Sequence, residues 1–460
     1  MKKILFTSLL SIIISLSFGQ QSFERLYQYW NYAEGNEVFT EEGGYIMAGF
    51  GKNDTTNYLF ILKADLSGDT IWLRNYGFGH RQSLYPWISS SIRDNDGNTY
   101  FAVRNTGDSI SFVKINPQWE LVWKKSLGQN FFIQKLTFTE DNHILAVGRD
   151  NAGDCIRKLD TNGSTMWRSQ NIWYNQFGSL IYSSILEMPD KNIVTISSWV
   201  NNTYFTITPS TITTYSSSGD SVSSVIFNPE SGNYNITQTH LIGEELLSIC
   251  RGNPYTEMKT SLIRHKVDGT ILMDKLLKTN AGFYKMVITN DNKIVASGGI
   301  QESNIERIVL HCATLEGDSL WTSYIGYSGE IWVYSMKLCS DNGLLLGGFS
   351  SITDWPYGHP YLVRTDSLGR ISPLSIQEAP INAVQVYPNP ASEKVVFETP
   401  GISKGSILIF DAYGRRCAAI KVSDERTVYD VSDLAPGIYI YTVSDNMKAY
   451  NGKLIIKSGQ

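Results

Sequence analysis

Several acidic side chains in this sequence of 460 residues are spaced closely enough to bind a cation. The segment Asp94-Asn95-Asp96-Gly97-Asn98 offers oxygen ligands of the kind that Ca²⁺ prefers. It lacks the downstream bidentate glutamate and the flanking helices of a helix–loop–helix calcium site. Asp141-Asn142 and Asp291-Asn292 occupy the same place in a repeated pattern. We therefore interpret the segment as a turn and assign no metal ligand to it.

A second motif, Gly317-Asp318-Ser319-Leu320, could supply a serine nucleophile and is similar to the nucleophile motif of a lipase-like hydrolase family. Gly68-Asp69-Thr70 and Gly219-Asp220-Ser221 occur at related positions, so the motif is one copy of a recurrent hairpin. No helix is predicted after it to provide an oxyanion hole. We expect no catalytic serine there.

The histidines also show no catalytic or metal-binding spacing such as H-E-x-x-H. They are His80, His143, His240, His265, His311 and His359. No G-x-S-x-G motif, phosphate-binding loop or dinucleotide fingerprint occurs. The sequence thus predicts no catalytic, cofactor-binding or metal-ligating residue, and we expect no cofactor.

Aromatic side chains outside the repeat pattern are the best candidates for ligand binding. We predict that they lie between strands or between repeat units, where they could stack on sugar rings or on extended peptides. Packing between units is the simpler alternative for each of them. They are Tyr85, Trp87, Trp173, Tyr174, Trp332, Tyr334, Trp355 and Tyr357.

These residues must be positioned by an internal repeat. An acid-led turn seven positions before a glycine occurs four times, ending at Gly49, Gly148, Gly298 and Gly348. The glycines are 99, 150 and 50 residues apart, which fits two, three and one repeats of about 50 residues. Looser copies fill the gaps at 96–103, 190–197 and 244–252. The pattern predicts seven units between residues 26 and 372.

A second marker follows the turn within each unit. Asp, Gly and Trp stand at offsets 0, 3 and 7 in the copies that end at Trp72 and Trp167, and Trp321 keeps the spacing from its glycine. This arrangement predicts a tight turn followed by a strand that opens with a large aromatic residue. The marker resembles the Asp-box of sialidase propellers, with one extra residue in each interval. We assign no arginine triad and infer no glycosidase chemistry.

Short strands and glycine-containing turns, without an amphipathic helix, predict an all-β fold. Clear strand patterns are 58–63, 110–115 and 308–313. A unit of about 50 residues is too short for an immunoglobulin-type sandwich and suits a four-stranded propeller blade. We predict a seven-bladed β-propeller over residues 20–372, with six or eight blades as the alternatives. The repeat style resembles that of secreted propeller-like proteins of the Bacteroidota, which implies a fold rather than an activity.

The C-terminal part departs from the repeat after a proline-containing linker at 373–382. Alternating patterns at 394–398, 406–410, 437–443 and 453–457 predict a small β-sandwich over 383–460. We expect turns at 411–414 and at Asn451-Gly452.

Four blocks of this part resemble the type IX secretion C-terminal sorting domain, type A. The first block contains Tyr387, Pro388, Asn389 and Pro390, and the second contains Asp411 and Gly414. The third contains Gly437 and Tyr439, and the last is Lys453, Leu454, Ile455, Ile456 and Lys457. The resemblance implies a domain that an outer-membrane translocon reads and that is usually removed. The body is then released or attached to surface lipopolysaccharide.

The N-terminus predicts export as well. Lys2 and Lys3 precede an uncharged apolar run at 4–18, and Gly19 and Gln20 flank a small-residue cleavage site. This pattern is typical of a signal peptide, residues 1–19, and no later run is long enough to predict a transmembrane segment. We expect the protein at the outer-membrane surface or outside the cell.

Charge and cysteine content exclude some functions and leave others open. The formal charge of −5, with scattered basic residues, gives no footprint for nucleic acid or anionic lipid. The five cysteines leave at least one thiol unpaired. Buried thiols are the favoured interpretation, and a disulfide stays possible.

Two functions fit these observations. One is a non-catalytic surface-binding or adhesion protein that recognises a glycan or a protein through one propeller face. The alternative is an extracellular hydrolase or lyase whose site is assembled from acidic residues of several blades, which sequence spacing cannot reveal.

Overall fold

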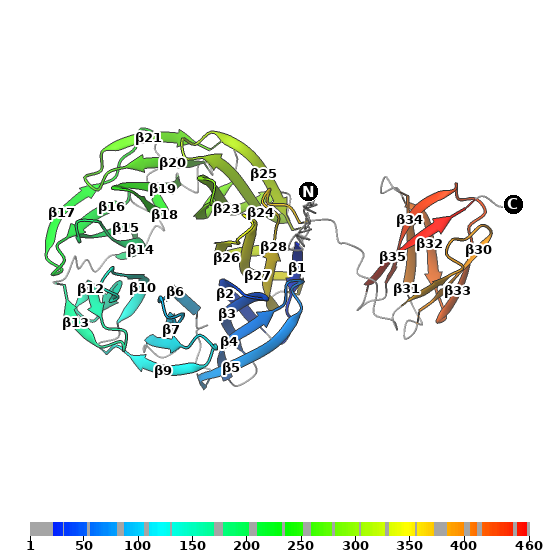
Figure 1. The fold of residues 1–460 in the computed structure, drawn as a ribbon, viewed down its shortest axis with the longest axis horizontal. Coiled ribbons are helices and arrows are strands. Elements are labelled where there is room, and N and C mark those ends of the chain that lie inside the picture. Colours follow the sequence, from blue (N-terminus) through cyan, green and yellow to red (C-terminus); the bar gives the residue numbers. More distant parts are fainter. Residues whose placement is uncertain are drawn as a thin grey trace, which may run out of the picture. The chain divides into compact units, whose positions relative to one another are not determined.

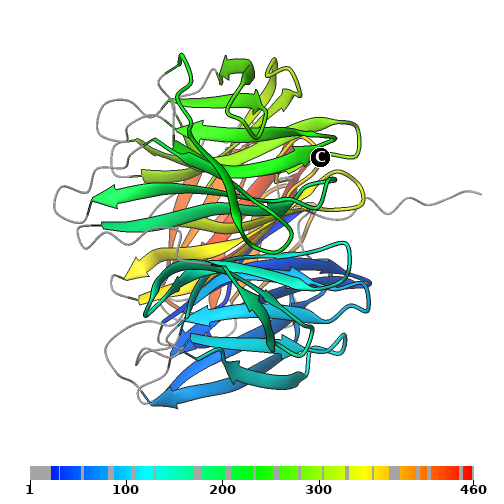
Figure 2. The ribbon, with the colours of Figure 1, turned by 90° about the vertical axis from the view of Figure 1, so that its left-hand side faces the viewer.

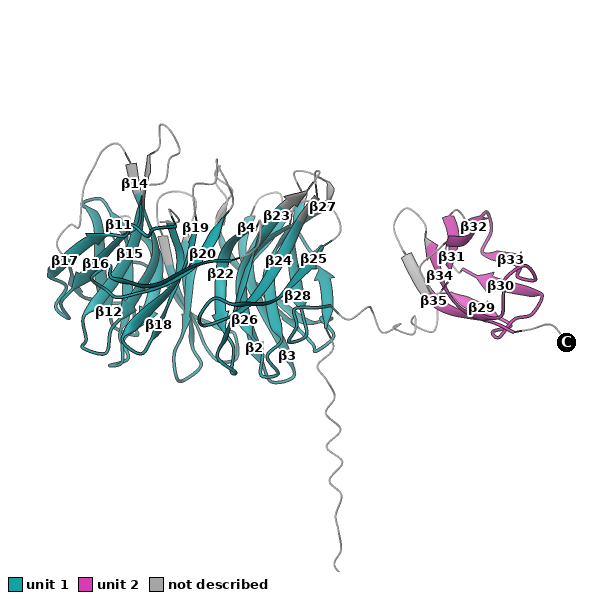
Figure 3. Ribbon diagram, turned by 90° about the horizontal axis from the view of Figure 1, so that it is seen from above, with its two compact units in different colours: residues 1–372 teal, residues 373–460 magenta. Residues whose placement is uncertain are grey.

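The computed structural model confirms the all-β prediction. It describes residues 22–30, 32–52, 56–80, 87–104, 110–128, 131–169, 178–201, 209–231, 235–251, 259–277, 281–302, 305–326, 331–354, 357–371, 384–399, 405–411, 416–444 and 449–457. These residues form strands and turns and contain no helix. The chain divides into two compact units, residues 1–372 and 373–460, coloured separately in Figure 3. They are called the body and the tail below.

The body is built from four-stranded antiparallel sheets whose strands follow one another along the chain. The first two sheets comprise β2 (Tyr32–Glu41), β3 (Gly44–Lys52), β4 (Thr56–Ala64), β5 (Thr70–His80), β6 (Trp87–Arg93), β7 (Thr99–Arg104), β8 (Ile110–Ile115) and β9 (Leu121–Ser126). The next two comprise β10 (Phe132–Phe138), β11 (Ile144–Asp150), β12 (Gly153–Leu159), β13 (Thr165–Arg168), β14 (Gly178–Glu187), β15 (Ile193–Asn201), β16 (Thr211–Tyr215) and β17 (Ser221–Ile226).

The remaining sheets of the body follow the same order, except that the last one takes a strand from the N-terminus. They comprise β18 (Asn235–Ile242), β19 (Glu245–Arg251), β20 (Thr260–His265), β21 (Ile271–Leu276), β22 (Gly282–Ile288), β23 (Lys293–Glu302), β24 (Ile305–Thr314), β25 (Ser319–Ile325), β26 (Ile331–Leu338), β27 (Leu344–Asp354), β28 (Tyr357–Arg364) and β1 (Phe23–Leu26). β1 pairs with β28, although the repeat pattern began only after it.

The sheets resemble propeller blades in their arrangement. Figure 1 shows them around a common centre, with strands such as β6, β10, β14 and β26 innermost and β5, β9, β17 and β1 outermost. In the view of Figure 2 the strands run between the two faces of the body. β2 also packs against β26, β27 and β28, so the first and last sheets of the chain are neighbours. Apolar side chains fill the spaces between adjacent sheets, which removes them from water.

A β-bulge interrupts the innermost strand of every sheet in the body at an equivalent position. It falls between Ile133 and Lys135 in β10 and between Phe283 and Lys285 in β22, for example. The repeat glycines lie beside these bulges: a Cβ on Gly148 would lie 1.8 Å from the carbonyl oxygen of Phe132. The repeat glycine therefore allows close approach of two backbones rather than forming a turn.

The acid-led turns join the first and second strands of each sheet. One residue of each turn has a positive φ between 58° and 82°: Gly43, Gly97, Asn142, Lys191, Gly243, Asn292 and Asn342. Gly and Asn tolerate this conformation best, which explains their recurrence in the pattern. Lys191 is the departure from that preference.

The second marker connects neighbouring sheets. A Cβ on Gly219 would lie 2.6 Å from the Trp167 ring, and one on Gly369 would lie 2.7 Å from the Trp321 ring. Trp167 and Trp321 thus cover the marker glycine of the following unit. In the second unit Trp119 occupies the turn position with φ 61°, and its indole lies in the same buried cluster as Trp72.

The tail is sandwich-like, with two sheets around one core. One sheet contains β29 (Gln385–Tyr387), β30 (Lys394–Glu398) and β33 (Arg426–Asp430), and the other contains β31 (Gly405–Phe410), β32 (Arg416–Val422), β34 (Gly437–Ser444) and β35 (Ala449–Ile456). The buried side chains of both sheets form one cluster that includes Phe397 and Tyr441.

The predicted turn at Asn451-Gly452 is wrong. Both residues lie inside β35, and Gly452 pairs with Tyr441 of β34. A Cβ on Gly452 would lie 2.2 Å from the Tyr441 hydroxyl oxygen. The glycine is present because the tyrosine side chain crosses over it, and packing rather than a reversal of the chain explains its place.

Candidate ligand-binding site

A cavity of about 660 Å³ lies among the innermost strands of the body. It is lined from β10, β14, β18, β22 and β26, together with residues near the ends of β15, β19 and β23. A smaller hollow of about 270 Å³ shares Lys135, Ser183, Thr237, Lys285 and Tyr334 with it. The cavity has the size of a small-molecule site, and five sheets contribute to its lining.

The bulges determine which side chains reach the cavity. Ser183, Thr237, Tyr284 and Tyr334 occupy the extra position of their bulges, and Lys135 and Lys285 follow directly after theirs. Bulges re-aim side chains and are common next to functional sites. Other bulge residues bind the adjacent sheet instead: Gln134 donates to the carbonyl of Leu180 at 2.9 Å.

Cationic side chains outnumber carboxylates along the described lining. Lys135, Lys285 and Arg251 line the cavity, and the smaller hollow adds Lys337 and Glu37. Glu37 accepts a hydrogen bond from Ser335 Oγ at 3.0 Å, and its Oε2 lies 3.9 Å from Lys337 Nζ. Neither Lys135 nor Lys285 forms an ion pair within the part of the chain that the structure describes.

Burial and repulsion by nearby positive charges lower the pKa values of Lys135 and Lys285. Burial, reinforced by the charge of Lys285 and opposed by Glu37, lowers the pKa of Lys135 to about 8. Burial also lowers the pKa of Lys285, with Lys337 adding to the shift against Glu37. Both side chains are half-buried and remain accessible from the cavity.

Aromatic side chains form part of the wall. Trp332 is 46% exposed and Tyr284 is 39% exposed, and both line the cavity. The Arg251 guanidinium lies 4.2 Å from the centre of the Tyr284 ring, which holds the two side chains together. The sequence predicts these aromatic residues between strands or between repeat units, but Trp332 and Tyr334 lie within β26, Trp87 begins β6 and Tyr357 begins β28. The predicted positions Tyr85, Trp173, Tyr174 and Trp355 lie outside the described residues.

The serine motif forms a hairpin, as its repetition indicated. Gly317 has φ 81° in the turn between β24 and β25, and its N–H donates to Thr314. Ser319 Oγ lies 3.2 Å from His311 Nε2, but Thr322 Oγ1 occupies the other ring nitrogen of that histidine at 2.8 Å. Asp318 contacts Lys275 at 3.0 Å. The motif therefore does not place a carboxylate on the histidine.

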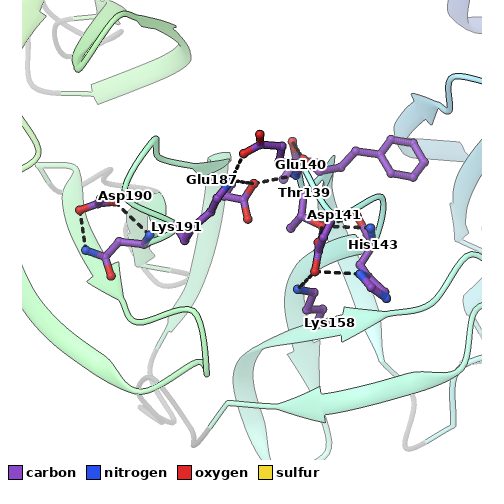
Figure 4. Close-up of polar contacts among 11 residues, drawn as sticks. Thr139, Glu140, Asp141, His143, Lys158, Glu187, Asp190 and Lys191 are labelled. Carbon is purple, nitrogen blue, oxygen red and sulfur yellow. Dashed lines mark hydrogen bonds and ion pairs between the residues drawn. The ribbon is translucent and has the colours of Figure 1, made fainter.

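Polar contacts also occur in the acid-led turns that join the first and second strands of the sheets. Figure 4 shows Asp141 in contact with Lys158 Nζ at 2.8 Å and with His143 Nδ1 at 3.0 Å. Although partial burial opposes ionisation, the hydrogen bonds from Lys158, Thr139 and His143 hold the pKa of Asp141 well below its usual value. These contacts are local to the turn and its sheet.

Lys191 links two neighbouring sheets in the same view. Its ammonium contacts Glu140 and lies 3.9 Å from Glu187, whose carboxylate accepts a hydrogen bond from the Glu140 N–H at 2.7 Å (Figure 4). This ion pair accounts for a lysine at a turn position where the other units carry Gly or Asn.

The described cysteines and histidines are structural in their surroundings. Cys155, Cys250, Cys312 and Cys339 are buried thiols outside any disulfide, and Cys417 is exposed. Burial lowers the pKa of His240, His265, His311 and His359. No group of acids, histidines and cysteines that could hold a metal ion is found in the described residues.

In the tail, the predicted motif blocks come together at the last strand. The Asn389 amide donates to the carbonyl of Lys453 at 2.7 Å and accepts from the N–H of Ile455 at 2.8 Å. Ala391 continues this contact by exchanging two backbone hydrogen bonds with Ile455 and Lys457. The first block therefore binds the final strand although more than sixty residues separate them.

The remaining tail residues divide between core and surface. Leu454 and Ile456 are buried, Ile455 is half-buried, and Lys453 and Lys457 are exposed. Tyr439 donates to the carbonyl of Ala435, while Tyr387 contacts Glu398. Gly437 begins β34, Asp411 follows β31, and Pro388 and Pro390 stand in the segment between β29 and β30. Gly414, like Gly19, Gln20 and the linker at 373–382, lies outside the described residues.

Sequence reasoning missed Lys135, Lys285 and Glu37. One signal could have found the two lysines: each stands 13 positions before a repeat glycine, Gly148 or Gly298. Glu37 occupies the equivalent position after the bulge of β2, so charged side chains recur at this place in the innermost strands.

Residues 385–457 match the family described as a secretion system C-terminal sorting domain. The predicted sorting domain is thereby confirmed. It indicates export to the cell surface or the extracellular space and implies an interaction with the type IX secretion system. No curated protein sequence matches the chain. Among the described residues, no helix has the length and apolar character needed to cross a membrane.

Solved structures similar to the body are distant. A catalytically inactive virginiamycin B lyase from Staphylococcus aureus with quinupristin is 12% identical, with 75% of this chain and 99% of that chain covered and a TM-score of 0.47. A Bacteroides caccae protein of unknown function is 16% identical, with coverage of 57% and 88% and a TM-score of 0.38. Drosophila Plexin A in complex with Semaphorin 1b is 9% identical, with coverage of 73% and 88% and a TM-score of 0.40. These likenesses carry no argument about ligand or activity.

Proposed function

We propose that this chain is an exported binding or adhesion protein whose body is a closed seven-bladed propeller, and that it binds a glycan or protein ligand without converting it. The supporting observation is the cavity of about 660 Å³, which is lined by five neighbouring sheets and combines exposed aromatic with half-buried cationic side chains. Aromatic faces and fixed polar groups are typical of ligand-binding cavities.

The arrangement of the sheets in the body supports the proposed count of seven blades. Each begins at one of the seven predicted units, and the contact of β2 with β26, β27 and β28 brings the first sheet against the last. Pairing of β1 with β28 would join the two ends of the proposed ring, and it covers the edge of β28 with a strand from the N-terminal end of the body.

The tail supports the exported location, and its exposed Lys453 and Lys457 are candidates for contact with the translocon. We propose that residues 1–19 are removed as a signal peptide and that the tail directs the folded body to the outer-membrane surface.

Array binding tests the proposed function. The full chain without residues 1–19 is applied to glycan and surface-protein arrays, and every bound compound is then incubated with the protein and analysed by mass spectrometry. We expect retention of at least one class of polymer, unchanged in mass. Absence of binding to all of them, together with turnover of one, would refute the proposal.

A lyase or hydrolase is the second candidate. The pKa of Lys135, lowered to about 8, brings its amine close to a proton-accepting state at neutral pH. Such an enzyme was expected to use acidic residues from several blades, but Glu37 is the one carboxylate among the described lining residues of the two cavities. Turnover that Lys135→Arg abolishes while binding persists would favour this candidate.

A further inference from the structure

We propose that the cavity binds an acidic glycan, with the carboxylate of a uronic acid residue seated between Lys135 and Lys285 and the sugar ring against Tyr284 or Trp332. This inference rests on the proposed function, since it names the ligand class of the same cavity.

The charge of the lining calls for an anion. Lys135, Lys285 and Arg251 line the cavity, and the carboxylate nearest to the lysines, Glu37, is already held by Ser335 and Lys337. Two half-buried ammonium groups that repel each other without an ion-pair partner are costly in the unliganded protein. A carboxylate at this place would remove the repulsion, so the lysines favour an anionic ligand over a neutral one.

The rest of the lining suits a sugar. Ser183, Thr237 and Asn235 are half-buried in the lining and offer neutral hydroxyl and amide groups that match sugar hydroxyls. The exposed faces of Tyr284 and Trp332 provide flat surfaces on which the apolar face of a pyranose can stack. The residue Ser297 also lines the cavity, and its buried Oγ has no hydrogen-bond partner in the described structure.

Calorimetric titration tests this assignment. The chain without residues 1–19 is titrated with a galacturonic acid pentamer, with the methyl ester of the same pentamer and with a glutamate pentapeptide. We expect the acid to bind at least tenfold more tightly than its ester, because esterification removes the charge and keeps the sugar body.

Lys135→Met and Lys285→Met, singly and together, are the matched variants. Each should weaken binding of the acid by tenfold or more and leave binding of the ester unchanged. Lys266→Met, at an exposed turn between β20 and β21, makes the same charge change away from the cavity and should have no effect. Removal of a half-buried charge should not lower the melting temperature, so lost binding would not reflect unfolding.

Equal affinity for acid and ester, or unchanged binding in the double variant, would overturn the inference. If the arrays still show a bound glycan, the proposed function survives that result. Preferential binding of the glutamate peptide would also overturn it in favour of a protein ligand.

The pH dependence provides a second readout. Binding of an anion between Lys135 and Lys285, beside Glu37, Lys337 and Arg251, requires protonated lysines. Because the pKa of Lys135 is lowered to about 8, affinity for the acid should fall as the pH rises from 7 to 9. Affinity for the ester should stay constant over that range, and a parallel fall for both ligands would contradict the lysine assignment.

Discussion

The tail and the body carry their information at different ranges along the chain. In the tail, contiguous blocks such as Tyr387 to Pro390 are recognisable as written, and Asn389 reaches the final strand directly. In the body, Lys135 and Lys285 come from two different sheets, those that begin at β10 and β22. Two further sheets, which begin at β14 and β18, separate them along the chain. Short motifs therefore indicate where the protein is exported, while its candidate ligand site is assembled from positions that are distant in sequence.

Removal of the tail should have the largest effect on this comparison. A chain that ends at residue 384 should fold its body normally and fail almost completely to reach the surface, because the sorting domain is lost. Cell fractionation with immunoblotting measures the location, and thermal unfolding of the purified body checks the fold. Normal delivery of the shortened chain to the surface would show that the tail is not the sorting signal.

The stability of the body should depend strongly on a single buried carboxylate, that of Asp150. Asp150, fully buried as a side chain, contacts Arg157 at 2.7 Å and Arg168 at 2.8 Å. Asp150→Asn leaves Arg157 buried without its counter-charge and should cost about 3 to 5 kcal/mol of unfolding free energy. Denaturant unfolding measures the loss.

Asp154→Asn is the matched control in the same hairpin. Burial opposes ionisation of Asp150, yet the bonds from Arg168 and Arg157 hold its pKa well below the usual value, whereas burial raises the pKa of Asp154 despite Arg149. Because the folded pKa of Asp150 is depressed, its contribution is present above the unfolded pKa of about 4 and is lost on further acidification. Asp150→Asn should flatten this acid-dependent loss. Asp154→Asn should not flatten it, and equal behaviour of the two variants would contradict the assignment.

Gly452→Ala should have a smaller effect, confined to the tail. The added Cβ would meet the Tyr441 hydroxyl, so the ring must shift, at a cost of about 1 to 3 kcal/mol for overpacking. Gly452→Ala combined with Tyr441→Phe should recover part of the loss, since it removes the colliding oxygen. Thermal unfolding of the tail transition measures both variants. A loss that Tyr441→Phe leaves untouched would favour a turn-like role for the glycine.

The smallest expected effect is a difference in stability between alanine variants of the two kinds of repeat glycine, Gly43 in an acid-led turn and Gly369 in the second marker. Gly43 (φ +72°) has open space around its Cβ position, whereas Gly369 (φ +69°) lies under the Trp321 ring. Gly43→Ala should cost about 1 kcal/mol for the left-handed backbone alone. Gly369→Ala should cost roughly 1 kcal/mol more because the ring must also move. Equal melting temperatures of the two variants would show that the tryptophan contact contributes nothing.

Much of the architecture could be predicted from the sequence, because local patterns specify local structure. The acid-led turns and their Gly or Asn residues mark the ends of strand pairs, and the predicted strand at 110–115 is β8 without a change of boundary. The pairing of β1 with β28 was not predicted, since a short strand of four residues contains no periodicity that names its partner.

The sequence by itself determined an all-β repeat, its turns and an exported tail, because each depends on residues close together in the chain. Only the tertiary structure decided which side chains face one another across the centre of the body. The bulges aim Lys135, Lys285, Tyr284 and Tyr334 at one cavity, and the register of separate sheets fixes their meeting. Such contacts arise from packing between sheets, and no spacing within a single unit encodes them.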